Sequence, residues 1–401
     1  MTKNICLGFA SEAQYEELVD DPMLFRDFLD TAYQQHPELF PADWERGFTF
    51  HDVYCSQKTG FFIRRVKLSS SQEVFSIRPS FLMPYLTART EEVEKALYLC
   101  QFGVPLEALV YVFGRDEMYW YRLILQFGRP SLVGTTVKSK EKLPTHLAVD
   151  EKHSWLNRAK VFIPTTVAKG VFLGATVVEK ADAEHLTSGY REFQEEASQL
   201  DPNYSPESVC TDGFFATRLA WRTLYQKVAL ILCYLHIIIK LRDRCRSNLR
   251  KEVLDRAWNI YRATTKRAFS QRARRFQAWA AKNLTNSILE IAGKLQKKTK
   301  EYLQAYEQPN CYRTSNAVDR LMNYQDRKLF AMRYFHHSNI KSARLLARAM
   351  AMIWNFHPYS QRLRRNDENR ISPFADLNGF QYHGNWLENF LIASSMGGKR
   401  L

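Results

Sequence analysis

The chain has 401 residues and a formal net charge of +15 at pH 7. Hydrophobic residues make up 45% of it and aromatic residues 13%, which indicates folded structure throughout and excludes a mainly disordered chain. The positive charge favours a polyanionic partner, either nucleic acid or an anionic membrane surface. The longest apolar run, Val228 to Ile239, is about half a membrane span, so we expect no membrane-spanning helix.

The cysteines and the amino terminus bear on the cellular compartment. Seven cysteines are scattered along the chain, and none belongs to a C-x-x-C pair. This odd and scattered set indicates neither a disulfide framework nor a zinc ribbon. No secretory signal pattern is present at the start. We therefore expect a reducing, cytoplasmic environment.

The first 140 residues are expected to form two small modules. Residues 1–85 combine a helical pattern with strand-like segments and predict an α+β module, which either contacts DNA or serves packing and dimerisation. Residues 86–140 contain three short helical patterns broken at Gly103 and Gly114. Their spacing resembles a helix-turn-helix unit that reads DNA with its third helix, although any compact three-helix bundle has similar spacing.

Two short apolar segments further on each lead to an aspartate. Leu147 to His153 is typical of a strand that carries Asp150 near its end, and Ser208 to Gly213 of a strand that ends at Asp212. Between them lie two β-branched runs typical of an antiparallel hairpin, followed by a helical pattern. These segments are Lys160 to Ala168, Val171 to Val178 and Asp182 to Gln199.

This order of elements is that of a ribonuclease-H-like fold. Three antiparallel strands are followed by a helix and further strands, and acids lie at the ends of the first and fourth strands. We therefore expect an α/β multidomain chain whose mixed-sheet core comprises residues 141–236 and 309–360.

A fifth strand is expected at Val228 to Cys233, and it ends in a C-x-x-H pair formed by Cys233 and His236. Such a pair binds zinc only with two further ligands, and no second pair has suitable spacing. We expect His236, with Cys233 as an accessory, to lie near the same cleft as Asp150 and Asp212. A histidine that only caps a strand end is the alternative.

Residues 237–308 are expected to form a helical insertion. Positions 240–300 hold 18 Lys and Arg against four Asp and Glu, which accounts for nearly the whole charge excess. Apolar and aromatic side chains recur there at helical intervals. Such dense charge with interleaved aromatics favours binding to DNA phosphates. The residues expected to make these contacts are Arg272, Arg274, Arg275, Lys297 and Lys298.

A third acid is expected after the insertion, where Ser315 is placed to cap a helix. Asp319 lies in the first turn of that helix, near the expected strand ends, and is the preferred third ligand. Asp326 on the same helix, and Glu301 and Glu307 before it, are the alternatives. Residues 361–401 are expected to form a C-terminal tail that binds a partner.

Together these motifs resemble the bacterial insertion-sequence transposases of the DDE class. They resemble in particular the branch, shared with Mutator-type elements, that has C-x-x-H after the second aspartate and a long helical insertion before the third acid. The resemblance covers residues 145–358. It rests on Val149-Asp150-Glu151, Cys210-Thr211-Asp212-Gly213, Cys233-Tyr234-Leu235-His236 and Ser315-Asn316-Ala317-Val318-Asp319-Arg320.

The resemblance implies a homo-oligomeric, nucleoid-associated enzyme that acts on element ends and target DNA, with no membrane partner. Its expected metal ligands are Asp150, Asp212 and Asp319, although such enzymes usually carry Glu at the third position. Transposition is an in-line displacement at phosphorus, which two Mg²⁺ ions assist, with Mn²⁺ as a substitute. Mg²⁺ needs only a few protein oxygens, so three carboxylates suffice.

Two other functions are compatible with these motifs. One is a ribonuclease-H-like nuclease without strand transfer, and the other is a catalytically inactive DNA-binding protein derived from a transposase. A basic insertion and a helix-turn-helix region favour the transposase, because that enzyme must hold two element ends and a target.

Overall fold

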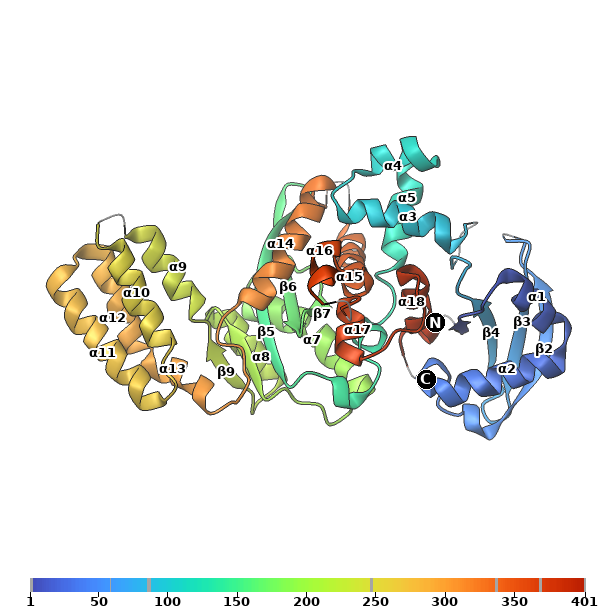
Figure 1. The fold of residues 1–401 in the computed structure, drawn as a ribbon, viewed down its shortest axis with the longest axis horizontal. Coiled ribbons are helices and arrows are strands. Elements are labelled where there is room, and N and C mark those ends of the chain that lie inside the picture. Colours follow the sequence, from blue (N-terminus) through green and yellow to red (C-terminus); the bar gives the residue numbers. More distant parts are fainter. Residues whose placement is uncertain are drawn as a thin grey trace.

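The computed structural model describes residues 3–57, 59–84, 88–245, 248–335, 338–367 and 370–399. The chain is of mixed α/β class and contains two β-sheets. The four-stranded sheet lies at one end of an elongated molecule, the five-stranded sheet in the middle, and a group of helices at the other end (Figure 1). The boundary expected at residue 85 falls outside the described residues.

The N-terminal module is α+β, as the sequence indicates. Its sheet has the order β1-β4-β3-β2, in which β1 runs parallel to β4 and the other pairs are antiparallel. Asp21 ends the first helix and caps the second by accepting the Met23 and Leu24 N–H groups, and Pro22 suits the first helical position. The elements are β1 (Asn4–Leu7), α1 (Glu12–Asp20), α2 (Pro22–Gln35), β2 (Phe48–Cys55), β3 (Phe62–Leu68) and β4 (Val74–Pro79).

The three short helices expected after this module are present. Gly103 and Gly114 both have positive φ, which ends the first two helices where the sequence places the breaks. Asp116 caps the third helix by accepting the Tyr119 N–H. The helices are α3 (Thr90–Gln101), α4 (Leu106–Phe113) and α5 (Glu117–Gln126), followed by the short α6 (Leu132–Thr136).

The central sheet has the strand order β7-β6-β5-β8-β9. Its first three strands in sequence are antiparallel, and β8 and β9 run parallel to β5. The expected hairpin is thus present, and its second strand ends at Ala175, three residues early. The strands are β5 (His146–Leu156), β6 (Ala159–Ala168), β7 (Val171–Ala175), β8 (Ser208–Thr211) and β9 (Ala229–Leu232).

Helices cover both faces of this sheet. Successive residues of a strand point to opposite faces, so Val149 belongs to one hydrophobic cluster and Ala148 to another. The Val149 face packs against α7 (Ala183–Leu200) and α8 (Phe215–Leu224). The Ala148 face packs against α14 (Asn316–Ala331) and α15 (Ile340–Phe356). Any residue near a strand end is thereby directed to one helical layer or the other.

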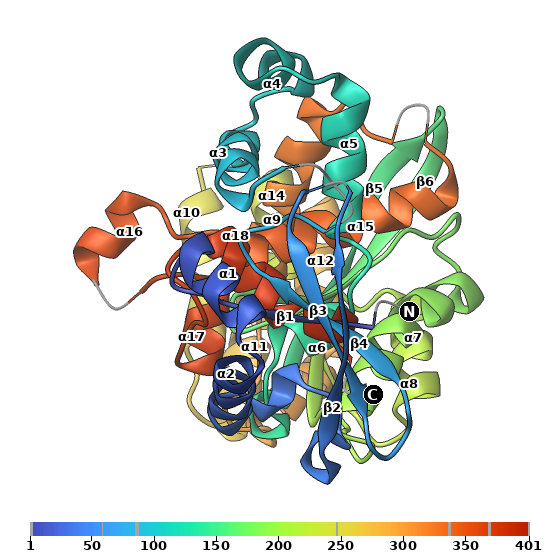
Figure 2. The ribbon, with the colours of Figure 1, turned by 90° about the vertical axis from the view of Figure 1, so that its right-hand side faces the viewer.

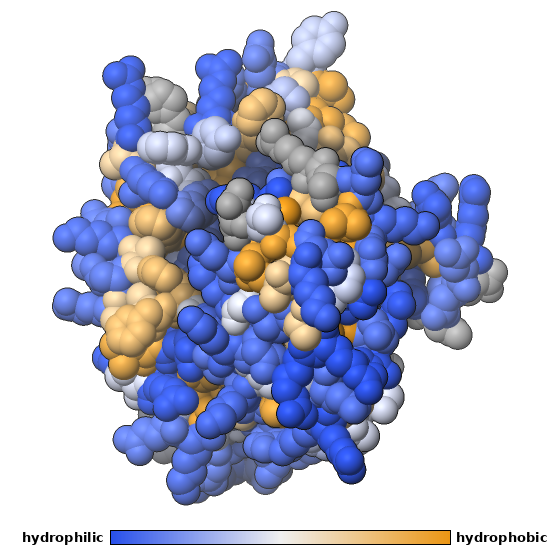
Figure 3. Space-filling model, turned by 90° about the vertical axis from the view of Figure 1, so that its left-hand side faces the viewer, coloured by the Kyte–Doolittle hydropathy of each residue, from blue (hydrophilic) through white to orange (hydrophobic). Residues whose placement is uncertain are grey.

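The segment between β9 and α14 is helical and has a hydrophobic cluster of its own. The apolar run Val228 to Ile239 divides between β9 and α9, so it is not one strand. This end of the molecule presents mainly hydrophilic side chains with a few apolar patches (Figure 3). In the described residues, no helix is long and apolar enough to cross a membrane. The helices are α9 (Leu235–Arg244), α10 (Arg250–Tyr261), α11 (Lys266–Asn283), α12 (Asn286–Lys297) and α13 (Thr299–Leu303).

The C-terminal residues are not a tail, which corrects the expectation from sequence. Helices α17 (Pro373–Asn378) and α18 (Trp386–Ala393) pack into the core. Phe374 and the apolar side chains of α18 belong to the cluster that contains Ala148, which is the main hydrophobic cluster, and Leu377 belongs to the cluster that contains Val149. Only α16 (Gln361–Asn366) projects from the body (Figure 2). The Ser395 hydroxyl accepts the Cys6 N–H and donates to the Leu39 carbonyl, which ties the two ends of the chain together.

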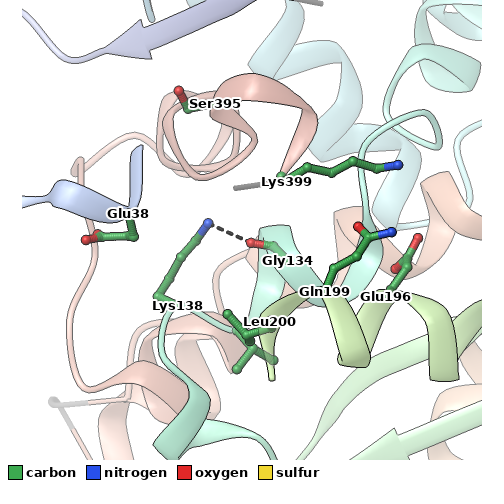
Figure 4. Close-up of a pocket in the computed structure, with 10 residues that line it drawn as sticks. Glu38, Gly134, Lys138, Glu196, Gln199, Leu200, Ser395 and Lys399 are labelled. Atoms are coloured by element: carbon green, nitrogen blue, oxygen red, sulfur yellow. Dashed lines mark hydrogen bonds between the residues drawn. The ribbon is translucent and has the colours of Figure 1, made fainter. Parts of the chain in front are cut away.

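A cavity of about 20 Å³ lies where this C-terminal segment meets the N-terminal module (Figure 4). The Lys138 ammonium donates to the carbonyls of Gly134 and Ala393. A buried ammonium requires such acceptors, so this lysine connects α6 with the end of α18 beside the cavity.

Candidate active site at the ends of the central strands

The register of the central sheet brings the first two candidate acids together. In the parallel pair of β5 and β8, Ala148 lies opposite Cys210. Asp150 and Asp212 each follow two residues later, so they lie at the same level and on the same face of strands about 4.8 Å apart. This is the face covered by α14.

A glycine is required directly after Asp212. Gly213 has a φ of +88°, and a Cβ atom there would lie 2.5 Å from Leu232 Cδ1. The turn lets Asp212 Oδ1 accept the Phe214 N–H at 2.7 Å. Any larger residue would strain the backbone and require the Leu232 side chain to move.

The third candidate acid, Asp319, lies in the first turn of α14. Ser315 does not cap this helix with its side chain, contrary to the expectation from sequence. Its hydroxyl is instead 2.8 Å from Asp319 Oδ2, and its N–H donates to Cys233 Sγ at 3.1 Å. Ser315 therefore connects the end of β9 with the acid on α14.

The three carboxylates are close enough to interact electrostatically. Burial raises the pKa of Asp150 to about 6, and the negative charges of Asp212 and Asp319 act in the same direction. The Glu151 N–H and the nearby His236 oppose this rise. Burial also raises the pKa of Asp319. A buried acid whose ionisation is disfavoured by neighbouring carboxylates is typical of a site that works with a positively charged ligand.

The alternative third acids are all engaged elsewhere. Asp326 forms an ion pair with Lys152. Glu301 pairs with Arg218 at 3.1 Å, and Glu307 pairs with Lys266. None of the three is among the groups that shift the pKa of Asp150. Of the four candidates for the third acid, Asp319 is therefore the one whose charge acts on Asp150.

These acids fit a hard divalent cation by chemical type, because carboxylate oxygens are the ligands that Mg²⁺ and Mn²⁺ prefer. Their present positions do not form a finished ligand set. Within the described residues, no group of three His, Cys, Asp or Glu side chains is placed to hold one ion. Each carboxylate instead accepts a local hydrogen bond, from Glu151 N–H, Phe214 N–H or the Ser315 hydroxyl. Each bond occupies one oxygen only, so holding one ion between the three side chains would require them to change position.

The C-x-x-H pair lies beside the acids. Ile231 is opposite Cys210, which puts Cys233 at the level of Asp212 on the next strand. A hydrogen bond with Cys233 raises the pKa of His236, which lies near Asp150 and Asp212. Hydrogen bonds from Cys210 and His236 lower the pKa of Cys233. The imidazole also opposes the rise in the pKa of Asp150.

A basic pocket opens next to Asp212. Its volume is about 290 Å³, and it extends from Asp212 and His236 between α9 and α12. Four cationic side chains line it, namely Lys240, Arg244, Lys294 and Lys298. Such a pocket suits a phosphate group near the acids.

The pocket was only partly foreseen from the sequence. Of the five residues expected to bind DNA, Lys298 lines it, whereas Arg272, Arg274, Arg275 and Lys297 do not. Arg272 donates to the Asn259 carbonyl at 2.6 Å. His236, Lys240 and Arg244 are spaced four residues apart, so the sequence could have predicted that they share one face of a helix.

Glu151 is a further, half-buried acid, which was not among the site residues expected from sequence. It points to the face opposite Asp150, where it accepts hydrogen bonds from the Tyr190 hydroxyl at 2.5 Å and the Thr217 hydroxyl at 2.8 Å. Burial raises the pKa of Glu151 to about 7. Glu151 thus anchors the end of β5 to α7 and α8, and its position next to Asp150 was the only signal in the sequence.

No protein-family model matches the chain, and no curated protein sequence matches it.

Proposed function

We propose that this protein is a DDE/D-type DNA transposase with a ribonuclease-H-like core. The observation that carries the proposal is the placement of Asp150 and Asp212 at one level of two parallel strands, with Asp319 interacting from α14. The strand order of the central sheet supports the same core. The substrate would be the ends of a mobile element and a target DNA.

The three aspartates would hold the metal ions, Mg²⁺ or Mn²⁺, which activate the attacking oxygen and stabilise the leaving oxygen of an in-line displacement when bound. Water would first cleave the DNA at the element end, and the freed 3′-OH would then attack the target at the same acids. Ser315 orients Asp319 through its hydroxyl. His236 offsets the negative charge of the acids.

The basic pocket supports a DNA substrate. Lys240, Arg244, Lys294 and Lys298 would bind phosphates of the strand that reaches Asp212. The outer basic residues of α11 and α12 would extend this contact along the duplex. The helix-turn-helix-like α3 to α5 would provide a separate contact to element DNA.

A second candidate is a catalytically inactive DNA-binding protein derived from a transposase. Two features of Asp319 favour it. Aspartate is shorter than the usual glutamate, so its carboxylate reaches less far, and the hydrogen bond from the Ser315 hydroxyl holds that carboxylate on α14. The same basic surfaces would then serve binding alone.

The test compares wild-type protein with the Asp150→Asn and Asp212→Asn variants. Asparagine keeps the shape of the side chain and removes the negative charge, so metal binding should fail while DNA binding persists. Asp326→Asn is the matched control, because Asp326 lies on α14 but pairs with Lys152. We expect wild type and Asp326→Asn to cleave element ends and join a pre-cut 3′-OH end to target DNA in Mg²⁺.

The two site variants should lose both reactions and still bind the DNA. Cleavage without joining in the wild type would indicate a nuclease. DNA binding without either reaction would indicate the inactive protein. Activity in both Asn variants would refute the assignment of the acids.

A further inference from the structure

A second pocket of about 380 Å³ lies where α3, α14, the end of α15 and α16 meet. We call it the aromatic pocket, and the lining residues that matter here are Tyr98, Phe102, Arg320, Arg327, Trp354 and His357. None of the candidate acids lines it. Its volume is in the range of ligand sites, about 300 to 1,000 Å³.

The aromatic walls are open to solvent. Phe102 is 64% exposed and Tyr98 is 36% exposed. Tyr98 stacks on His357 with ring centroids 5.0 Å apart, and its centroid is 5.2 Å from that of Phe102. An exposed ring fixed by its neighbours costs little entropy when a planar ligand stacks on it, because its position is already set.

The charge of the pocket is positive. Arg320 and Arg327 lie seven residues apart on α14, hence on one face, and both are exposed. Neither forms a salt bridge with any described residue, and the described lining contains no Asp or Glu. The adjacent α16, which projects from the body (Figure 2), adds Arg362, Arg364 and Arg365. The ligand should therefore be anionic.

The pocket wall also contains a neutral histidine. Burial lowers the pKa of His357 to about 4, so the ring is neutral at pH 7. Its Nε2 is buried and has no hydrogen-bond partner among the described residues. A neutral ring adds no charge, so the arginines determine the charge of the pocket.

An unpaired nucleotide is both anionic and planar, with base faces that are free to stack. We propose that the aromatic pocket binds a segment of single-stranded nucleic acid. Bases stack on Phe102 and Tyr98, and phosphates bind Arg320 and Arg327. A duplex does not fit this role, because the faces of its bases are already stacked. The proposal does not depend on the candidate acids.

The test measures binding of the full-length protein to fluorescein-labelled oligothymidine and oligouridine of about 12 nucleotides, and to a duplex, by anisotropy. Phe102→Ala should weaken binding of the single strand about tenfold and leave duplex binding unchanged. Phe330→Ala is the matched control, because Phe330 is 75% exposed on α14 but does not line the pocket. It should bind both ligands as wild type does. Circular dichroism verifies that each variant is folded.

The charge is tested separately. Arg320→Gln with Arg327→Gln should flatten the salt dependence of single-strand binding by about 1.4 in slope, whereas Arg222→Gln on α8 should not change it. Stronger binding of oligothymidine would identify the ligand of the aromatic pocket as DNA, and stronger binding of oligouridine would identify it as RNA. Equal loss in Phe102→Ala and Phe330→Ala, or no single-strand binding by the wild type, would overturn the proposal. Asp150→Asn should bind the single-stranded oligonucleotides as wild type does. Failure of the transposase proposal can therefore be distinguished from failure of the aromatic-pocket proposal.

Discussion

Lys328 offers a direct test of the core between α3 and α14. Its side chain is 7% exposed, and its amine has no hydrogen-bond partner among the described residues. Burial lowers its pKa from 10.5 to about 7, with Arg327 acting in the same direction and Cys100 opposing it. This difference corresponds to about 5 kcal/mol of cost to the folded state when the lysine must be protonated.

Lys328→Met keeps a long apolar side chain and removes this cost. Between pH 7 and pH 10 the unfolded chain binds more protons than the folded chain, so the stability of the wild type rises with pH. At pH 7 nearly the whole penalty is present, and the variant should be more stable than the wild type by up to about 4 kcal/mol. By pH 9 the difference should shrink by about 2 kcal/mol.

The assay is urea denaturation followed by tryptophan fluorescence at pH 7 and pH 9, with Lys341→Met as the control. Lys341 is exposed on α15, so its removal should change neither the stability nor its pH dependence appreciably. The reasoning fails if Lys328→Met destabilises the protein at pH 7, or if its difference from wild type is the same at both pH values.

Three further results are expected. Arg348→Met should lower the free energy of unfolding, measured in urea, by about 3 to 5 kcal/mol, because this buried guanidinium pairs with two glutamates of α7. A change near zero would show that these ion pairs do not stabilise the fold. Gly128→Ala should lower the melting temperature markedly, since a Cβ there would lie 2.0 Å from the Leu345 carbonyl oxygen. An unchanged melting temperature would show that the backbone at Gly128 can move away from α15 without cost. Lys240→Gln with Lys294→Gln should flatten the salt dependence of duplex DNA binding by about two units of slope, and an unchanged slope would remove the basic pocket from the DNA interface.

Local patterns in the sequence were sufficient to place much of the central sheet. The β-branched runs around Lys169-Gly170 specify a hairpin through alternation and turn chemistry, which act over a few residues. Asp212 followed by Gly213 marks a strand end for the same reason, because glycine adopts a φ of +88° without strain. The basic character of the helical block is likewise a property of composition alone.

Contacts between distant segments could not be read from the sequence. The strand Asn4–Leu7 has four residues and becomes a strand only by pairing with β4, more than 60 positions later. Residues 373–397 resemble a tail in isolation, and only their packing against the main hydrophobic cluster shows that they are part of the fold. Ser315 has the sequence position of a helix cap, yet its hydroxyl bonds Asp319 and its N–H bonds Cys233.

The basic pocket and the aromatic pocket show the same difference between local patterns and contacts of distant segments. Helical spacing places Lys240 and Arg244 on one face of α9, but only the tertiary structure sets Lys294 and Lys298 across from them. The aromatic pocket joins side chains from α3, α14 and the end of α15, which no local pattern relates. Sequence determines which residue types each element presents, because propensity and alternation are local. The tertiary structure decides which of these residues contact one another, because each contact depends on packing that many distant residues determine together.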